Sequence, residues 1–215
     1  GVTRAKRVRT TIPDPDAVRP PDLVDRQFRG PAPHMLVVAD FTYVRLVTGV
    51  FVYTAFVIDA FAGRIVGWEC SASKHDRFVR SAIRQAVALR LEEGKPLSGN
   101  TIHHSDAGSQ YTSVRFGETL SLSGLTPSIG SVGDAFDNAL AETTIGLYKT
   151  EAVRADSPFR RGPLHRLADV ELLTAEWVHW YNTSRLMHRL GRTPQIEFEA
   201  EHYARQVATQ PGAHQ

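Results

Sequence analysis

The sequence has almost no cysteine and no long apolar run. Cys70 is the single cysteine among 215 residues, which excludes an internal disulfide and a metal site built from several thiolates. No stretch reaches about 18 apolar residues, and the beginning lacks the apolar region of a signal peptide. We therefore expect no membrane span and an intracellular protein.

The sequence also lacks a strong charge of either sign. The formal net charge is +2, from 25 Lys and Arg against 23 Asp and Glu, and this alone does not argue for nucleic acid. The first ten residues, "GVTRAKRVRT", nevertheless carry four basic residues and no acid. They fit a solvated tail as well as a segment that contacts DNA.

Prolines are concentrated at the start. Residues 1–33 hold six of the twelve, and the run "IPDPDAVRPPD" cannot form a helix or a central strand. We predict a basic, proline-rich linker over 1–33 that follows a segment outside this chain. At the other end, we expect residues 201–215 to be a disordered tail.

Between these segments the pattern is typical of a mixed α/β domain. Three apolar, β-branched runs are followed by an amphipathic helix, with Ser73 and Asp76 in a capping pattern at its start. A strand, a helix, a short strand and further helices come next, and Asp137 is a candidate N-cap. The predicted strands lie within 34–44, 49–61, 63–70, 100–106 and 125–130, and the predicted helices within 71–96, 113–124, 139–153 and 167–184.

Three acids stand where the pattern does not require them. Asp40 closes an apolar strand, Asp106 ends the strand "NTIHHSD", and Glu142 lies near the start of a helix. If the first and fourth strands are adjacent, the two aspartates meet there and the helix can bring the glutamate. Convergent carboxylates repel one another, so the pattern predicts a bound cation. Without thiolates, hard oxygen ligands favour Mg²⁺ or Mn²⁺, and two such ions support phosphodiester chemistry.

Each of these residues also has an ordinary interpretation. Asp40 fits a strand-end turn, Asp106 an Asx-turn, and Glu142 a solvated helix position. Lys149, two helical turns after Glu142, could hold a substrate phosphate or be surface charge. Asp59 is a rival carboxylate that the turn "IDAFAGR" explains. A zinc site at His103 and His104 is disfavoured because neighbouring strand residues point to opposite faces, and Ser105 lacks the glycines of a nucleophile elbow.

Four ordered motifs resemble a known family. "VADFTYV", "HHSDAGSQYTS", "GDAFDNALAETTIGLYKTE" and "YNTSRLMHRLGRTPQIEFE" are similar to the conserved segments of bacterial transposases of the insertion sequence 3 family, which share the D-D-E core of retroviral integrases. Thirty-five residues separate Asp106 from Glu142, as in that core. The resemblance runs from about residue 4 to 203. Val38 departs from it, where related sequences often place tryptophan nearby, and the family's amino-terminal helix-turn-helix is absent.

The resemblance implies an RNase H-like α/β fold over 34–200, with a mixed five-stranded sheet flanked by helices. It implies that Asp40, Asp106 and Glu142 ligate two Mg²⁺ or Mn²⁺ ions. It also implies cleavage at the ends of an insertion sequence to leave a 3′-hydroxyl, and transfer of that hydroxyl to target DNA. Transposon ends and target DNA would be the partners, with a homo-oligomer assembled on DNA, in the bacterial cytoplasm at the nucleoid.

Further residues are candidates for DNA contact. In the second motif, the loop after Asp106 can present hydroxyls and N–H groups to phosphates. The DNA-contact candidates are Lys149, Asn138, Ser109, Gln110, Tyr111, Arg185 and His188. Two other functions remain open: a catalytically silent DNA-binding or assembly module, and an RNase H-like nuclease that cuts without joining.

Overall fold

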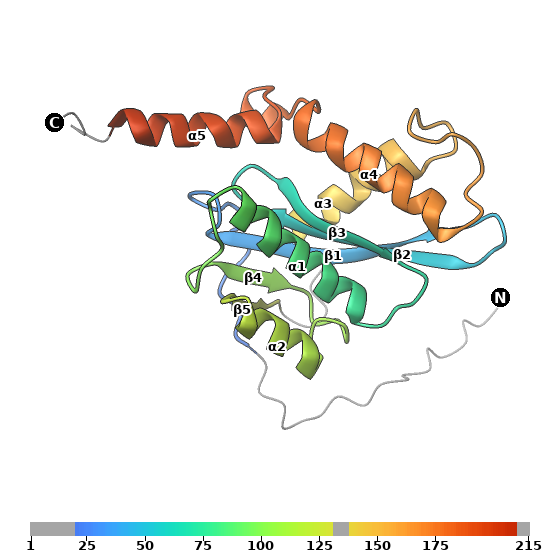
Figure 1. The fold of residues 1–215 in the computed structure, drawn as a ribbon, viewed down its shortest axis with the longest axis horizontal. Helices are drawn as coiled ribbons and strands as arrows, with labels where there is room; N and C mark the ends of the chain where they lie inside the picture. Colours follow the sequence, from blue (N-terminus) through green and yellow to red (C-terminus); the bar gives the residue numbers. More distant parts are fainter. Residues whose placement is uncertain (1–19, 131–137, 210–215) are drawn as a thin grey trace, which may run out of the picture.

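The computed structural model describes residues 20–130 and 138–209. Its centre is a five-stranded sheet with the strand order β3-β2-β1-β4-β5 (Figure 1). The first three strands form an antiparallel meander, and β4 and β5 run parallel to β1. The strands are β1 (Leu36–Arg45), β2 (Phe51–Asp59), β3 (Arg64–Ser71), β4 (Ile102–Ser105) and β5 (Thr126–Ile129). The predicted mixed sheet, with its first and fourth strands adjacent, is confirmed.

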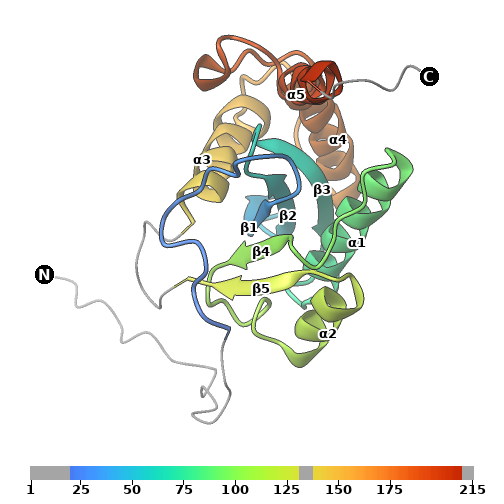
Figure 2. The same ribbon diagram turned by 90° about the vertical axis from the view of Figure 1, so that its left-hand side faces the viewer.

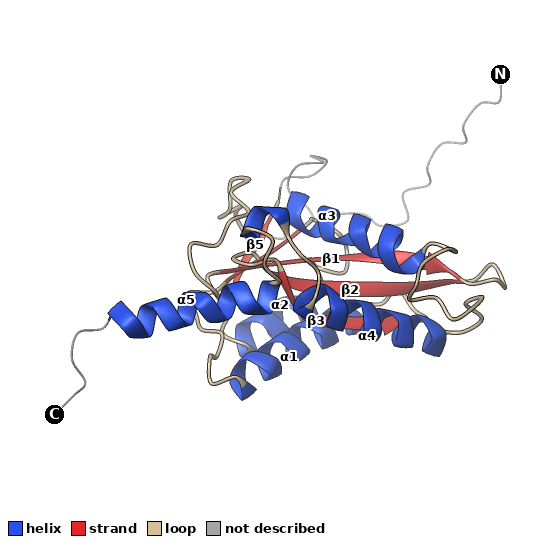
Figure 3. Ribbon diagram, turned by 90° about the horizontal axis from the view of Figure 1, so that it is seen from above, coloured by secondary structure: helices blue, strands red, loops and turns tan. Residues whose placement is uncertain are grey.

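Helices cover both faces of the sheet (Figure 2). On one face lie α1 (Arg77–Glu92) and α2 (Val114–Leu122), and on the other lie α3 (Ala139–Leu147) and α4 (Leu167–Thr183). A π-helix, η1 (Tyr148–Val153), continues α3 without a break. After a 3-10 turn, η2 (His188–Leu190), helix α5 (Gln195–Thr209) extends past the end of the sheet (Figure 3).

The alternation of strand residues builds two cores. Along β1, Val38 packs with Phe56 and Trp177 on the α4 side. Val37 and Ala39 pack on the α1 side, with residues of α1 and β2. Helix α1 approaches β3 closely at Gly67, where an added Cβ would lie 2.1 Å from the Ala82 carbonyl oxygen. These contacts fix β1 at the middle of the domain.

Two predicted boundaries need correction. Residues 20–33 belong to the proline-rich stretch, yet Val24 is buried in the core and Phe28 packs against it. The prolines prevent a helix or a strand here, but the apolar side chains of this segment still pack on the domain. Helix α5 continues through residues 201–209, where we expected a disordered tail, and Glu199 and Tyr203 tie it to the core. Residues 1–19 and 210–215 lie outside the described residues.

The predicted helix caps fare differently. Asp76 occupies the N-cap position of α1 but makes no capping hydrogen bond. Its carboxylate instead accepts a hydrogen bond from Ser113 Oγ at 2.9 Å and pairs with Arg80. The capping box predicted with Ser73 is therefore wrong, because the carboxylate is used in a longer-range contact. The candidate cap Asp137 lies outside the described residues.

Candidate active site

The register of β1 and β4 brings two of the predicted acids together. The strands are parallel, and their pairing ends with Ala39 opposite Ser105. The next residue on each strand is Asp40 and Asp106, and neighbouring strands are separated by about 4.8 Å. Asp40 and Asp106 are therefore the residues directly after the last paired residues of β1 and β4.

A buried asparagine brings the third acid to this place. Asn138 Nδ2 donates a hydrogen bond of 3.0 Å to the carbonyl oxygen of Ala39, the residue before Asp40. The beginning of α3 is thereby fixed against β1. Glu142 follows one helical turn after Asn138, and its N–H donates to the Asn138 carbonyl. Asn138, one of the predicted DNA contacts, positions the start of the helix that carries Glu142.

The pKa of Asp40 indicates that the charges of Asp106 and Glu142 act on this carboxyl. Burial raises the pKa of Asp40 to about 7, and the negative charge of Asp106 adds to this shift. A hydrogen bond from the Phe41 N–H, 2.7 Å long, opposes it, and the charge of Glu142 contributes a further increase. Lys149 acts on the same carboxyl in the opposite direction. The acids are thus close enough for each to affect the charge of Asp40.

Asp106 opens an exposed loop. Its Oδ1 accepts the Gly108 N–H at 3.0 Å, so the Asx-turn interpretation is correct for its backbone. A Cβ on Gly108 would lie 2.8 Å from the same oxygen, which explains the glycine. Further along, Ser109 is exposed and Gln110 Nε2 donates to the Lys74 carbonyl oxygen at 3.0 Å.

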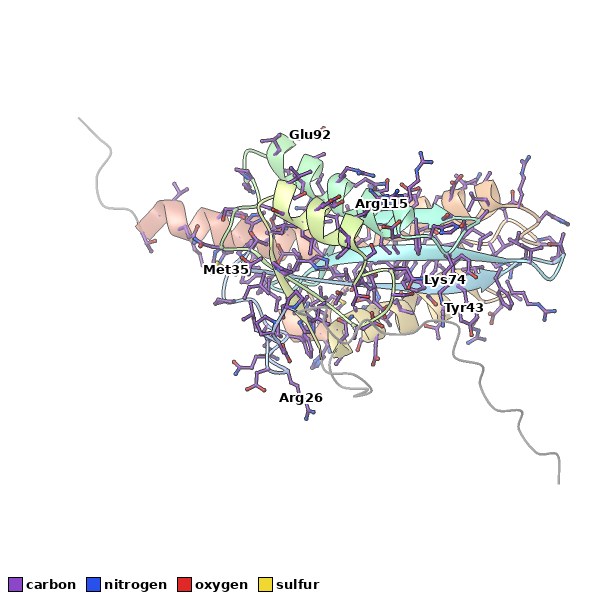
Figure 4. The ribbon with its side chains drawn as sticks, turned by 90° about the horizontal axis from the view of Figure 1, so that it is seen from below. Arg26, Met35, Tyr43, Lys74, Glu92 and Arg115 are labelled. Carbon is purple, nitrogen blue, oxygen red and sulfur yellow. The ribbon has the colours of Figure 1, made fainter. Side chains whose placement is uncertain are left out.

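A surface hollow lies beside this loop. It is lined by Lys74, His75, Asp76, Ser109, Gln110, Ser113, Val114 and Arg115. Lys74 and Arg115 both project on the side of the molecule seen in Figure 4. The hollow therefore combines polar groups and cations, and the loop that follows Asp106 contributes Ser109 and Gln110 to it.

No three His, Cys, Asp or Glu side chains in the described parts of the chain converge closely enough to hold a metal ion as they stand. The chemistry of the donors nevertheless fits a hard divalent cation. The set consists of three carboxylates, and the charges of Asp106 and Glu142 raise the pKa of Asp40, a repulsion that a cation relieves. Beside them, Asn138 Oδ1 is buried and has no hydrogen-bond partner among the described residues. Asp40, Asp106 and Glu142 are the residues that would hold the ion.

Lys149 reaches this region from the π-helix. Its Nζ lies 5.2 Å from the centroid of the exposed Tyr43 ring, three residues along β1 from Asp40. A π-helix inserts one residue per turn relative to an α-helix, and such segments are frequent at functional sites. Lys149 is the second residue of this π-helix.

A partly buried set of hydrogen bonds holds the π-helix in place. Glu151 accepts hydrogen bonds from Arg185 Nε at 2.9 Å and Arg185 Nη2 at 2.7 Å, and from Trp177 Nε1 at 3.2 Å. Arg185, predicted to contact DNA, is therefore engaged in a two-pronged ion pair between η1 and the end of α4. Sequence reasoning missed this role, because Glu151 gives no local signal that distinguishes it from a surface helix residue.

The remaining candidates divide into buried and exposed residues. Tyr111 is buried, and its ring packs 5.3 Å from that of Phe116, beneath the site. Burial, with the charges of Asp40 and Asp106, raises the pKa of Tyr111 well above its usual value. His188 is exposed at the beginning of η2.

The paired histidines diverge, as the alternation of a strand requires. The His103 ring packs against Phe116, with ring centroids 5.3 Å apart, whereas His104 packs against Phe28 and its Nδ1 lies 2.9 Å from Ser128 Oγ. Both are buried. The side chains are therefore arranged for packing on opposite faces, and a joint zinc site is excluded.

Asp59 belongs to a separate cluster. Its Oδ1 accepts the Phe61 N–H at 3.0 Å, as the turn interpretation predicts, but its Oδ2 pairs with the fully buried Arg90 at 2.9 Å. Arg90 also binds Glu199 of α5 at 2.5 Å and Glu93 at 2.9 Å. This carboxylate is therefore structural.

Comparison with known proteins identifies the family of this chain. The integrase core domain family matches residues 30–135 and, through a second description of the same domain, residues 123–194. A protein of Mycobacterium tuberculosis assigned as transposase for insertion sequence element IS986/IS6110 is 50% identical over 204 residues, covering 95% of this chain and 71% of that protein. The transposase for insertion sequence element IS629 of Shigella sonnei is 48% identical over 204 residues, covering 95% and 64%.

Solved structures share the fold at low sequence identity. The catalytic core domain of HTLV-2 integrase in complex with magnesium superposes with a TM-score of 0.60 at 20% identity, covering 80% of this chain and 99% of that one. A chain of the simian T-cell lymphotropic virus intasome gives a TM-score of 0.63 at 18% identity, covering 86% and 60%. The expected RNase H-like fold is therefore confirmed.

Proposed function

The chain belongs to the integrase core domain family and, within it, to the bacterial insertion-sequence transposases, and on this premise we propose that it cuts and joins DNA at the ends of an insertion sequence through Asp40, Asp106 and Glu142. The observation that carries the proposal is the environment of Asp40. Its pKa is raised to about 7 by burial and by the two other acids, at the place where β1 and β4 stop pairing.

We propose that the three carboxylates hold divalent cations, Mg²⁺ or Mn²⁺, two in number when DNA is bound. The charge pattern supports this, because among the described residues Asp40, Asp106 and Glu142 form no ion pair with Lys or Arg. Bound cations would neutralise phosphate charge and activate the attacking oxygen, first of water and then of the 3′-hydroxyl.

The chain's own residues then position the DNA. Lys149 is exposed beside Asp40 and suits a phosphate next to the reacting one. On the other side, Ser109 and the hollow with Lys74 and Arg115 offer a hydroxyl and two cations to the sugar–phosphate backbone. Holding both reacting strands in register supplies much of the rate, because joining then becomes effectively intramolecular.

The wider organisation follows from the same proposal. The substrates are transposon ends and target DNA, and pairing two ends requires a homo-oligomer on the DNA. Residues 1–33 would lead from a DNA-binding region, with 34–200 as the catalytic core. Residues 20–33 pack on that core through Val24 and Phe28, and the Leu23 N–H donates a hydrogen bond to Ser128 Oγ. No helix in the described ranges, 20–130 and 138–209, is both long and apolar enough to cross a membrane.

A strand-transfer assay tests this function. A labelled donor duplex with a pre-cut 3′-end and a supercoiled plasmid target would be incubated with the chain in Mg²⁺, Mn²⁺ or EDTA. We expect joined product with metal, none in EDTA, and none from Asp40→Asn or Glu142→Gln. Cleavage without joining would support a nuclease instead, and DNA binding with neither reaction, also after fusion to an amino-terminal DNA-binding region, would support a silent module.

A further inference from the structure

One face of the β1–β2 hairpin carries a row of aromatic side chains. The register places Tyr43 opposite Tyr53 and Arg45 opposite Phe51, so these residues and Phe41 share one face. The row begins under α1, where Phe41 lies 5.4 Å from Phe78 between ring centroids. It ends in solvent at Tyr43 and Phe51.

The outer end of the row is unusually exposed for aromatic residues. Tyr43 is 57% exposed and Phe51 44%, and their rings meet edge to face with centroids 5.2 Å apart. Cross-strand aromatic pairs stabilise hairpins, and this accounts for the contact between the two rings. It does not account for ring faces left open to solvent, which in folded proteins mark binding surfaces when they gather together.

Cations surround this row. Lys149 Nζ lies 5.2 Å from the centroid of Tyr43, and Lys74 Nζ lies 5.5 Å from that of Phe41. Tyr43 and Lys74 project on the same side of the molecule (Figure 4). Arg45 is exposed beside Phe51, and the sequence has no acid between Asp40 and Asp59. None of these three cations forms an ion pair with another described residue.

The row is also joined to the catalytic acids. Tyr43 lies three residues beyond Asp40 on β1, a rise of about 10 Å. Lys149 connects the two, since it stands over Tyr43 and acts on the charge of Asp40. Asp40 and Tyr43 point to opposite faces of β1, but the pairing of β1 with β4 ends at Ala39, and Lys149 reaches both residues past that point. A DNA strand that passed over this unpaired edge of β1, with one phosphate at the acids, would have its next nucleotides beside Tyr43 and Phe51.

From this arrangement we infer that Tyr43 and Phe51 form a stacking platform for unpaired nucleobases of a DNA strand, with Lys149 and Arg45 holding its phosphates. The inference rests on the proposed function and adds the substrate form that the site takes, a duplex end with a single-stranded or frayed segment. Aromatic stacking beside backbone cations is the general mode by which proteins bind single strands without reading sequence.

Binding of a fluorescent DNA tests the platform without requiring catalysis. The probe is a 20-base-pair duplex with a five-nucleotide overhang that carries 2-aminopurine at one overhang position in turn, mixed with the full chain at low salt without Mg²⁺ or Mn²⁺. Stacking on an aromatic ring quenches this base. We expect quenching at one or two overhang positions with the unsubstituted chain and with Tyr43→Phe.

Tyr43→Leu is the informative variant, because it keeps an apolar side chain and removes the aromatic face. We expect it to lose the quenching and to raise the Kd about tenfold, with an unchanged dependence on salt. Arg45→Gln should retain quenching and lower the salt slope by about 1. Leu91→Ala, at a 64% exposed position on α1, is the control and should change neither.

Several results would overturn the platform. One is an unsubstituted chain that quenches at no overhang position, and another is Tyr43→Leu binding like the unsubstituted chain. A third is Tyr43→Leu dissociating a dimer in sedimentation without affecting DNA, since the row would then cover a second copy of the chain. The strand-transfer assay separates this from the function: joining that depends on Glu142 but not on Tyr43 defeats only the platform. Quenching without Glu142-dependent joining defeats only the function.

Discussion

The domain contains two sets of acidic side chains. One set is paired with arginines, and the other has no such partner among the described residues. Asp59, Glu93 and Glu199 surround two guanidinium groups, those of Arg90 and Arg64, with contacts from 2.5 to 3.5 Å. Asp40, Asp106 and Glu142 have no such partner among the described residues. Lys149 acts on Asp40 as the smallest of the contributions to its pKa.

The difference separates a structural cluster from a site. A buried charge needs a partner, and the chain supplies it from α1 where the purpose is to fix α5 to the sheet. If the three acids hold a metal, as proposed, an arginine between them would occupy the place of that metal. The chain therefore leaves the repulsion uncompensated at the place where the pairing of β1 with β4 ends.

The largest difference between the two sets should appear when an aspartate of each set is replaced by asparagine. Asp106→Asn is expected to reduce strand joining at least a thousandfold, because one metal ligand is lost, while leaving the free energy of unfolding within about 0.5 kcal/mol. Asp59→Asn should instead lower the free energy of unfolding and leave strand joining by the folded protein nearly unchanged. Joining kinetics together with urea denaturation would measure both, and a destabilised Asp106→Asn would show that the two sets are alike.

Removing the central cation of the structural cluster is the next largest effect. Arg90→Met leaves Asp59 and Glu199 buried without a partner, and we expect a loss of about 3–5 kcal/mol in the free energy of unfolding. Arg161→Met is the matched control, since Arg161 pairs with Glu176 in solvent and should change stability by less than about 1 kcal/mol. Equal losses in the two variants would contradict the role given to Arg90.

A smaller effect should follow from releasing the π-helix. Arg185→Gln removes the ion pair to Glu151, and we expect about 1–2 kcal/mol of destabilisation and a roughly tenfold lower kcat for joining. The KM for donor DNA should change less than kcat, because Lys149 remains present but is less well positioned. Arg154→Gln breaks an exposed pair with Asp156 and serves as the control. An Arg185→Gln enzyme with normal kcat would leave Arg185 a purely structural residue.

The smallest expected effect concerns pH. Burial, and then the charge of Arg90, lowers the pKa of His34 from 6.5 to about 4. The unfolded chain therefore binds the extra proton first, and His34 costs stability as pH falls from about 6.5 to 4. The cost is about 1 kcal/mol once partial exposure is allowed for. The His34→Asn variant, which tolerates the positive φ of 68°, should show a shallower loss in urea denaturation across this range. An equal loss of stability with falling pH in the variant and in the unsubstituted chain would contradict this role of His34.

Much of the site could be predicted from the sequence because its signals are local. Apolar alternation defined the strands, and acids at strand ends stood out against it. The adjacency of β1 and β4 followed from the element order, which placed Asp40 beside Asp106. The packing of residues 20–33 on the domain was not predicted. Prolines prevent regular structure, but they do not prevent the side chain of Val24 from being buried.

What could not be predicted depends on contacts between distant segments. Arg90 lies on an amphipathic helix where a solvated side chain is the ordinary expectation, and its partner Glu199 is 109 residues away. Arg185 lies in a signature that suggested DNA contact, yet Glu151 holds it. The π-helix has no periodic signature, because one inserted residue leaves the apolar pattern almost unchanged.

The most direct test of this account is the free energy of unfolding of Asp40→Asn, measured by urea denaturation at neutral pH in EDTA and in 10 mM Mn²⁺. If the acids are held uncompensated for a metal, the variant should match or exceed the unsubstituted chain in EDTA by up to about 2 kcal/mol. It should also lose the Mn²⁺-dependent stabilisation of about 1 kcal/mol expected for millimolar affinity. An Asp40→Asn chain that is less stable in EDTA and is stabilised by Mn²⁺ as before would contradict it.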